Sequence, residues 1–92
     1  MRFDFDRRKS ARLGKNPRRG IGFEEAQQIF SQPYYLDRRS GVSDQWRAIG
    51  WVGDRLYTVI FDIREDAEGE YYHLVTLWKA TREEQEIYEE HS

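Results

Sequence analysis

The 92-residue sequence has no cysteine, two prolines, two histidines and no long hydrophobic run. Without cysteine there is no disulfide framework, no thiolate metal site and no cysteine nucleophile, and a cytoplasmic location is the expectation. No apolar run approaches the ~20 residues of a membrane span, and the charged start from Arg2 is unlike a signal peptide, so we expect no membrane association. A metal site built on His73 and His91 would need ordered terminal residues, so we expect neither metal nor cofactor.

The residues that are present favour one small folded domain. Charged residues make up 35% of the chain, yet aromatic residues reach 15%, a share too high for a disordered chain. Because a domain usually takes ~100–200 residues, the chain has room for a single domain over residues 1–92.

Charge is distributed unevenly along the chain. Residues 1–22 hold eight basic and two acidic residues, a local balance of +6, whereas residues 83–92 add five glutamates to an overall net charge of −2. A basic segment of this density indicates a surface for nucleic acid or for an acidic partner, although a merely solvated helix and loop would have the same composition.

The N-terminal half is predicted to be mainly helical. After a short strand over residues 3–5, Asp6 can cap a helix over residues 7–13 that ends at Gly14. A basic, mobile loop follows, then a second helix over residues 23–30 that ends before Pro33. Residues 34–45 are expected to be irregular.

The C-terminal half changes to a period of two, which predicts strands. These strands are expected at residues 45–52, 55–63 and 70–78. Gly53 suits a type II′ hairpin turn, residues 64–69 form a polar loop, and strict alternation puts His73 on the same strand face as Lys79. Thr81 and Glu84 form a capping box that opens a last helix through residue 90. The predicted fold class is α+β: a two-layer domain with an antiparallel sheet of three to four strands, two N-terminal helices and a C-terminal helix.

Four strings, in this order, resemble the pattern of the BrnT family of bacterial toxins, which are small ribonucleases distantly related to RelE. The matching strings are FDFDRRK at 3–9, RRGIGFEEA at 18–26, DR at 37–38 with RAIG at 47–50, and HLVTLWKATREE at 73–84. The chain departs from the family pattern at several positions, and its last helix is acidic where the family's is commonly basic. The departing residues are Arg19, Val42, Ser43, His73 and Trp78.

The resemblance implies a metal-independent endoribonuclease in which the RNA 2′-hydroxyl attacks the adjacent phosphate. Arginine and lysine suit the stabilisation of the extra negative charge, and a histidine suits proton transfer. The expected catalytic residues are Arg47, Arg64, Lys79 and His73. The expected RNA-binding residues are Arg18, Arg19, Arg38, Arg82 and the stacking residue Trp78.

The resemblance also implies partners. A cognate antitoxin of the ribbon-helix-helix type, similar to BrnA, would neutralise the toxin, and operator DNA would be bound only through the antitoxin complex. Two other functions stay open from the sequence: a non-catalytic interaction module on the same fold, favoured by the departures, and a generic nucleic-acid-binding domain, favoured by the basic segment alone.

Overall fold

The computed structural model describes residues 1–42 and 44–92 and has an α+β fold, as predicted. Ser43, one of the departing positions, lies outside the described residues. The strands are β1 (Arg2–Asp4), β2 (Tyr35–Arg38), β3 (Trp46–Val52), β4 (Arg55–Asp66) and β5 (Gly69–Lys79). The helices are α1 (Arg7–Lys15), α2 (Phe23–Ala26), the 3₁₀ helix η1 (Gln27–Ser31) and α3 (Arg82–Glu90). None of the described helices has the length and apolar character to cross a membrane.

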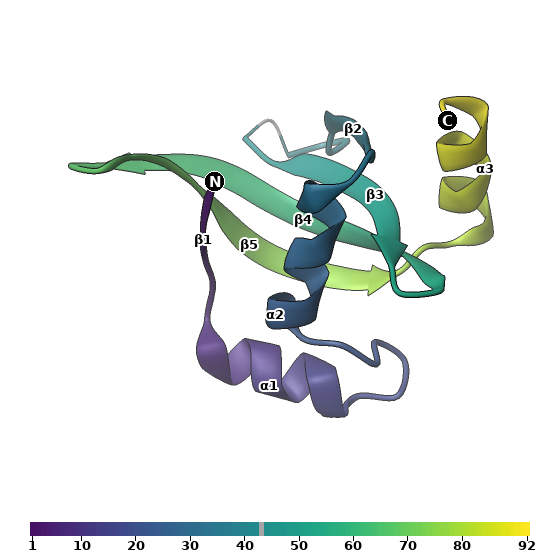
Figure 1. Ribbon diagram of the computed structural model, residues 1–92, viewed down its shortest axis with the longest axis horizontal. Coiled ribbons are helices and arrows are strands. Elements are labelled where there is room, and N and C mark those ends of the chain that lie inside the picture. Colours follow the sequence, from purple (N-terminus) through teal and green to yellow (C-terminus); the bar gives the residue numbers. More distant parts are fainter. Residues whose placement is uncertain (43) are drawn as a thin grey trace.

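The sheet is larger than predicted and mixed. Its order is β1-β5-β4-β3-β2, and β1 runs parallel to β5 while every other pair is antiparallel. The expectation of an antiparallel sheet of three to four strands is therefore wrong in number and direction. Figure 1 shows α1 below the sheet and α3 standing at its far end, well apart from each other.

Two segments expected to be irregular are strands. β2 lies within residues 34–45, where a run of four is too short to show alternation, and it is fixed by pairing with β3. Residues 64–69 extend the β4–β5 hairpin instead of forming a loop, with Asp66 opposite Gly69. Gly69 has a φ of +108°, a conformation that side chains rarely adopt, and this allows the tight turn.

The three predicted helices begin where the sequence predicts, and the last also ends at Glu90 as predicted, whereas the first two end differently. The Asp6 carboxylate accepts a hydrogen bond from the Lys9 amide at 3.0 Å, which caps α1. The helix then continues through Gly14 to Lys15, because Gly14 has no positive φ to end it. The second predicted helix is divided into α2 and the tighter η1.

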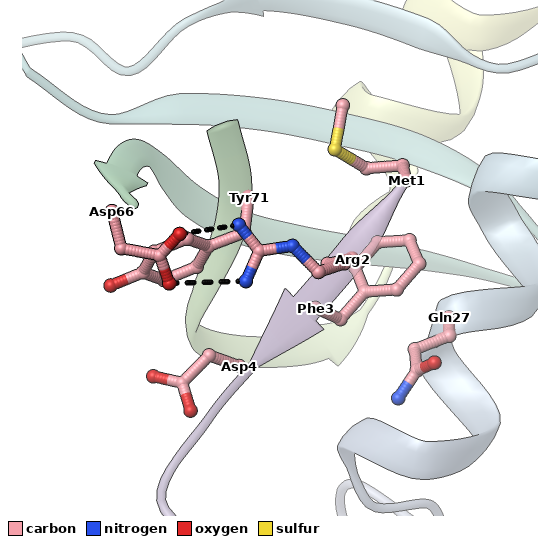
Figure 2. Close-up of a pocket in the computed structure, with 7 residues that line it drawn as sticks. All are labelled: Met1, Arg2, Phe3, Asp4, Gln27, Asp66 and Tyr71. Carbon is pink, nitrogen blue, oxygen red and sulfur yellow. Dashed lines mark hydrogen bonds and ion pairs between the residues drawn. The ribbon is translucent and has the colours of Figure 1, made fainter. Parts of the chain in front are cut away.

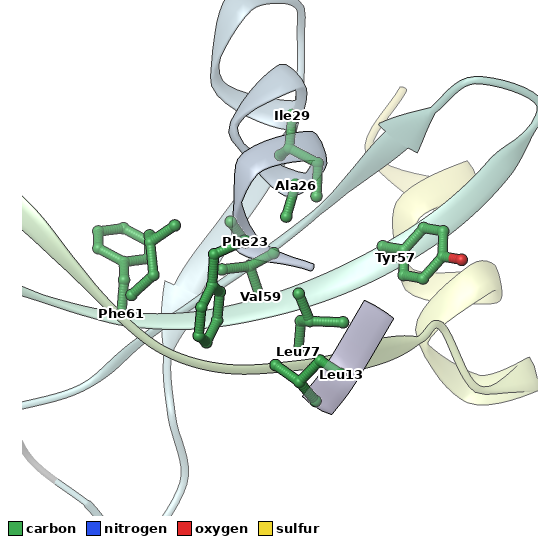
Figure 3. Close-up of a cluster of buried hydrophobic side chains, with 10 residues drawn as sticks. Leu13, Phe23, Ala26, Ile29, Tyr57, Val59, Phe61 and Leu77 are labelled. Atoms are coloured by element: carbon green, nitrogen blue, oxygen red, sulfur yellow. The ribbon is translucent and has the colours of Figure 1, made fainter. Parts of the chain in front are cut away.

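The larger core lies between the sheet and the two N-terminal helices. Leu13 of α1 and Phe23 of α2 pack on Val59 and Leu77 of the central strands (Figure 3). A smaller cluster of Ile49, Leu56 and Ala80 lies on the opposite sheet face, under α3. Helices thus cover both faces of the sheet. The residues that the sequence predicts to form the site lie partly on one face and partly on the other.

A β-bulge changes the side-chain parity of β5. The register shifts between Ile60 and Phe61, so that Ile60 pairs with Thr76 and Phe61 with Leu74. Leu74 and Leu77 consequently enter the same core although they are three residues apart. The prediction that His73 shares a face with Lys79 is wrong, because the bulge places them on opposite faces.

Candidate functional site

The residues expected to form one catalytic site lie in three places. Lys79 points toward the loop that carries Arg18 and Arg19, on the face covered by α1 and α2. Arg47 and Trp78 line a cleft beside α3 on the other face, and Arg38 lies at its rim. Arg64 and His73 lie further along that second face, on the protruding hairpin, and Arg82 is exposed on α3.

The loop between α1 and α2 is held by hydrogen bonds, in contrast to the mobile loop expected from its sequence. The Asn16 side-chain oxygen accepts from the Arg18 amide at 2.9 Å, and the Asn16 carbonyl accepts from the amides of Arg19 and Gly20 at 2.9 and 2.8 Å. The Tyr57 hydroxyl donates to the Arg19 carbonyl at 2.7 Å. Burial raises the pKa of Tyr57, which keeps this hydroxyl a donor at neutral pH.

Lys79 is fixed against the same loop. Its ammonium donates to the Pro17 carbonyl at 3.0 Å. Gly20 has a φ of +82°, and a Cβ there would lie 3.3 Å from the Tyr57 hydroxyl and 3.7 Å from Cε of Lys79. Only glycine combines this backbone conformation with so close an approach. The K-A-T and R-R-G strings, sixty residues apart in sequence, therefore meet in space.

Lys9 of α1 donates to the Val75 carbonyl, and we call the other cations of α1, those of its following loop and Lys79 the basic surface. Its members are Arg7, Arg8, Arg12, Lys15, Arg18, Arg19 and Lys79. Within residues 1–42 and 44–92, none of them forms an ion pair with a carboxylate. Nε of Arg19 is buried without a hydrogen-bond partner. Asp6 and Glu24 interact with Arg8, Arg12 and Arg7 only at longer range, so the surface keeps an excess of positive charge, which favours an anionic ligand.

The second place is a cleft of about 430 Å³ beside α3, which we call the α3 cleft. Arg47 donates to both carboxylate oxygens of Asp37, from Nε at 2.9 Å and from Nη2 at 2.6 Å. Its Nη1 lies 3.5 Å from the Glu84 carboxylate, which also accepts from the Trp78 indole at 2.9 Å. Arg47 is therefore neutralised by two acidic side chains.

The pKa values in the α3 cleft follow from these pairs. Burial favours the neutral form of Asp37, but hydrogen bonds from Arg47 and Tyr35 outweigh it and hold the pKa of Asp37 below its ordinary value. The same hydrogen bond raises the pKa of Arg47. Both groups thus stay charged at neutral pH, in a pair whose charges cancel.

Arg64 and His73, on the protruding hairpin, each contact a carboxylate too. Arg64 lies 2.8 Å from the Asp62 carboxylate, and His73 lies 3.0 Å from that of Asp4. Figure 2 shows the neighbouring pocket, where the Arg2 guanidinium meets the Asp66 carboxylate beside the Tyr71 ring. This region presents alternating charge and no net attraction for phosphate.

Sequence reasoning missed three residues of the α3 cleft. Glu84 carries a visible capping-box signal, confirmed by its 2.9 Å contact with the Thr81 amide, but nothing in the sequence marks its contacts with Arg47 and Trp78. Asp37 was visible as part of a matching string, and Arg39 only as part of the charged run over residues 37–39. In the described part of the chain, no cluster of acidic or histidine side chains is arranged to hold a metal ion.

No known protein-family model matches the chain, and no curated protein matches it either.

Proposed function

We propose that this protein is an endoribonuclease toxin that holds RNA on the basic surface and cleaves it beside Lys79 without a metal ion. The observation that carries the proposal is the hydrogen bond from Lys79 to the Pro17 carbonyl, on the hydrogen-bonded loop that also carries Arg18 and Arg19. Fixed and uncompensated cations stabilise a transition state, because they need no rearrangement as negative charge develops.

In the reaction the RNA 2′-hydroxyl gives its proton to water and its oxygen bonds to the adjacent phosphorus, which forms a 2′,3′-cyclic phosphate. The bond from phosphorus to the 5′-oxygen of the next nucleotide breaks, and that oxygen takes a proton from water. Lys79 uses one N–H on the Pro17 carbonyl and keeps two for phosphate oxygens. The Nε of Arg19 is buried, so a further donor for the same phosphate would come from the Nη groups of its guanidinium. Arg18 and the α1 cations lie more exposed and supply affinity for the flanking phosphates.

Arg47, Arg64 and His73 take no catalytic role in this proposal. Each is held by a carboxylate, and all three lie on the sheet face opposite Lys79. A compensated guanidinium adds less to the stabilisation of developing negative charge, because its partner's negative charge opposes it. The proposal therefore assigns the stabilisation of the developing negative charge to Lys79 and Arg19.

Single-turnover cleavage at saturating RNA, with a metal chelator present, tests the proposal. Lys79→Ala should lower the cleavage rate ~100-fold, the scale of losing one preorganised donor. Arg64→Ala is the matched control, since it removes a compensated cation from the opposite face and should leave the rate unchanged. Absence of cleavage by the folded wild-type protein, or cleavage abolished by the chelator, would contradict the proposal.

The resemblance to BrnT toxins extends the proposal to a partner. A ribbon-helix-helix antitoxin similar to BrnA would cover the basic surface in a complex of two toxins and two antitoxins, and would contact operator DNA. Expression of the chain alone should then arrest bacterial growth, and Lys79→Ala should lift the arrest. Normal growth with soluble wild-type protein would argue against an active toxin.

A second function, a non-catalytic interaction module, is favoured by a specific observation. The neutralisation of Arg47 by Asp37 and Glu84 leaves the α3 cleft without net positive charge. Such a module would bind RNA or an acidic partner through the basic surface and would leave RNA intact in the cleavage experiment.

A further inference from the structure

The α3 cleft contains a set of groups that the proposed reaction does not use. Besides the neutralised Arg47, it is lined by Trp78, Arg39 and Glu83. The Arg39 guanidinium carbon lies 5.9 Å from the centre of the Trp78 ring, so the cation and the indole share one end of the cleft. The volume of about 430 Å³ falls in the range of pockets that hold small ligands.

The hydrogen-bonding capacity of these groups is unequal. Asp37 and Glu84 are occupied by Arg47, Tyr35, Trp78 and the Thr81 amide. The exposed Glu83, in contrast, has no ion pair in the described part of the chain. A free carboxylate is therefore available to accept hydrogen bonds.

Arg39 supplies the complementary donors. It gives one N–H to the Gln45 side chain at 2.9 Å, and among the described residues no carboxylate forms an ion pair with it. Its remaining N–H groups can donate to a ligand. The α3 cleft thus offers an aromatic ring, a guanidinium with spare donors and a free carboxylate.

We propose that the α3 cleft binds a guanine base of the RNA chain, which rests on the proposed function in that RNA is the ligand. Guanine presents two neighbouring acceptors, O6 and N7, which suit an arginine fork. Its N1–H and 2-amino group are neighbouring donors that suit a carboxylate, and its ring stacks on an indole. Arg39, Glu83 and Trp78 match these three features in turn.

The other bases fit this set less well. Adenine has an amino donor in place of O6, so it meets Arg39 with a donor where an acceptor is needed. Cytosine and uracil lack the adjacent pair of donors that a carboxylate can accept, and their single rings offer less surface for stacking. A carboxylate and a guanidinium in one cleft therefore select guanine.

Calorimetric titration with free 5′-nucleotides tests the base preference without any cleavage. GMP should bind the wild-type protein about tenfold more tightly than AMP, CMP or UMP, the scale of one good bidentate contact. Inosine monophosphate lacks the 2-amino group and should bind several-fold more weakly than GMP. In NMR spectra, GMP binding should shift the resonance of the Trp78 indole N–H. The variant Trp78→Phe identifies this resonance, because the signal is then missing from the spectrum.

Two matched variants on α3 locate the carboxylate. Glu83→Gln should abolish the difference between GMP and inosine monophosphate, whereas Glu86→Gln, which alters an exposed glutamate on the same helix that pairs with Arg82, should preserve it. Equal binding of GMP and the other nucleotides, no binding at all, or an equal effect of both variants overturns the assignment. Because free nucleotides contain no scissile bond, these outcomes are independent of whether the protein cleaves RNA.

Discussion

At the scale of single residues, the structure divides the cations into those paired with carboxylates and those without such a pair among the described residues. Arg47 on β3 and Lys79 on β5 are both basic residues on strands that flank β4. Arg47 meets Asp37 and Glu84, whereas Lys79 donates to the Pro17 carbonyl and forms no ion pair with a carboxylate of residues 1–42 and 44–92. Residue type and spacing are the same kind of signal for both, so the sequence alone did not distinguish them. The distinction depends on which carboxylates the fold brings near.

The Asp37–Arg47 pair predicts a pH-dependent contribution to stability. Because the pKa of folded Asp37 lies below the ordinary value of 3.8, its contribution is fully present above that value and is lost as pH falls through the folded-state pKa. Asp37→Asn should therefore destabilise the protein at pH 7 by about 1–3 kcal/mol. The difference from wild type should shrink in strong acid.

Urea unfolding of both proteins at pH 7 and at pH 3 measures this difference. Asp54→Asn serves as the control, because Asp54 is exposed in the β3–β4 turn and has no ion pair in the described residues. A constant difference between Asp37→Asn and wild type across this pH range would rule out the pair as its cause.

At the scale of elements, local signals identified what local interactions determine. Asp6 and Thr81 cap their helices as predicted, and Gly53 at a φ of +62° makes the predicted turn. The position of β2 depends instead on pairing with β3, and the bulge beside Phe61 depends on fitting two strands to one core. A four-residue segment contains no information about the distant strand with which it pairs.

The packing at the junction of α1 and α2 predicts that alanine substitutions at two glycines change the stability of the protein in opposite directions. Ser10 accepts a hydrogen bond from the Phe23 amide at 2.8 Å and donates to the Glu24 carboxylate. A Cβ at Gly22 would lie 2.6 Å from the Ser10 hydroxyl oxygen and 2.7 Å from its carbonyl oxygen, so Gly22→Ala should sharply lower the melting temperature. A Cβ at Gly14 meets nothing closer than 3.6 Å inside a helix.

Gly14→Ala should consequently stabilise the protein by about 0.5–1 kcal/mol, because alanine restricts the unfolded chain more than glycine does. Thermal unfolding of the two variants beside wild type gives both values. If Gly22→Ala unfolds at the wild-type temperature, the close packing of Ser10 on Gly22 does not hold α2 in place.

At the scale of the whole molecule, the uneven charge of the sequence becomes a separation in space. The basic segment forms α1 and its loop, whereas the glutamates form α3 at the far end of the sheet (Figure 1). The sequence predicted the basic region and its residues Arg18 and Arg19, since composition alone reveals a charged surface. That Lys79 would join them, and Arg47 would not, follows from the sheet faces and the bulge.

This separation of charge predicts that RNA phosphates lie on the basic surface. The dependence of RNA affinity on salt concentration tests this prediction. Each phosphate contact on single-stranded RNA contributes about 0.7 to the slope of log affinity against log salt concentration, because bound cations release counterions. Arg18→Ala combined with Arg19→Ala should reduce that slope by about 1.4.

Fluorescence anisotropy measures the affinity at each salt concentration. A labelled RNA whose 2′-hydroxyls are methylated keeps the strand intact during the titration. The matched control, Arg2→Ala with Arg64→Ala, removes two cations that are already paired with carboxylates on the hairpin, and the slope should stay unchanged. A reduced slope in the control with a wild-type slope in the loop variant would place the RNA phosphates on the β4–β5 hairpin instead of on the basic surface.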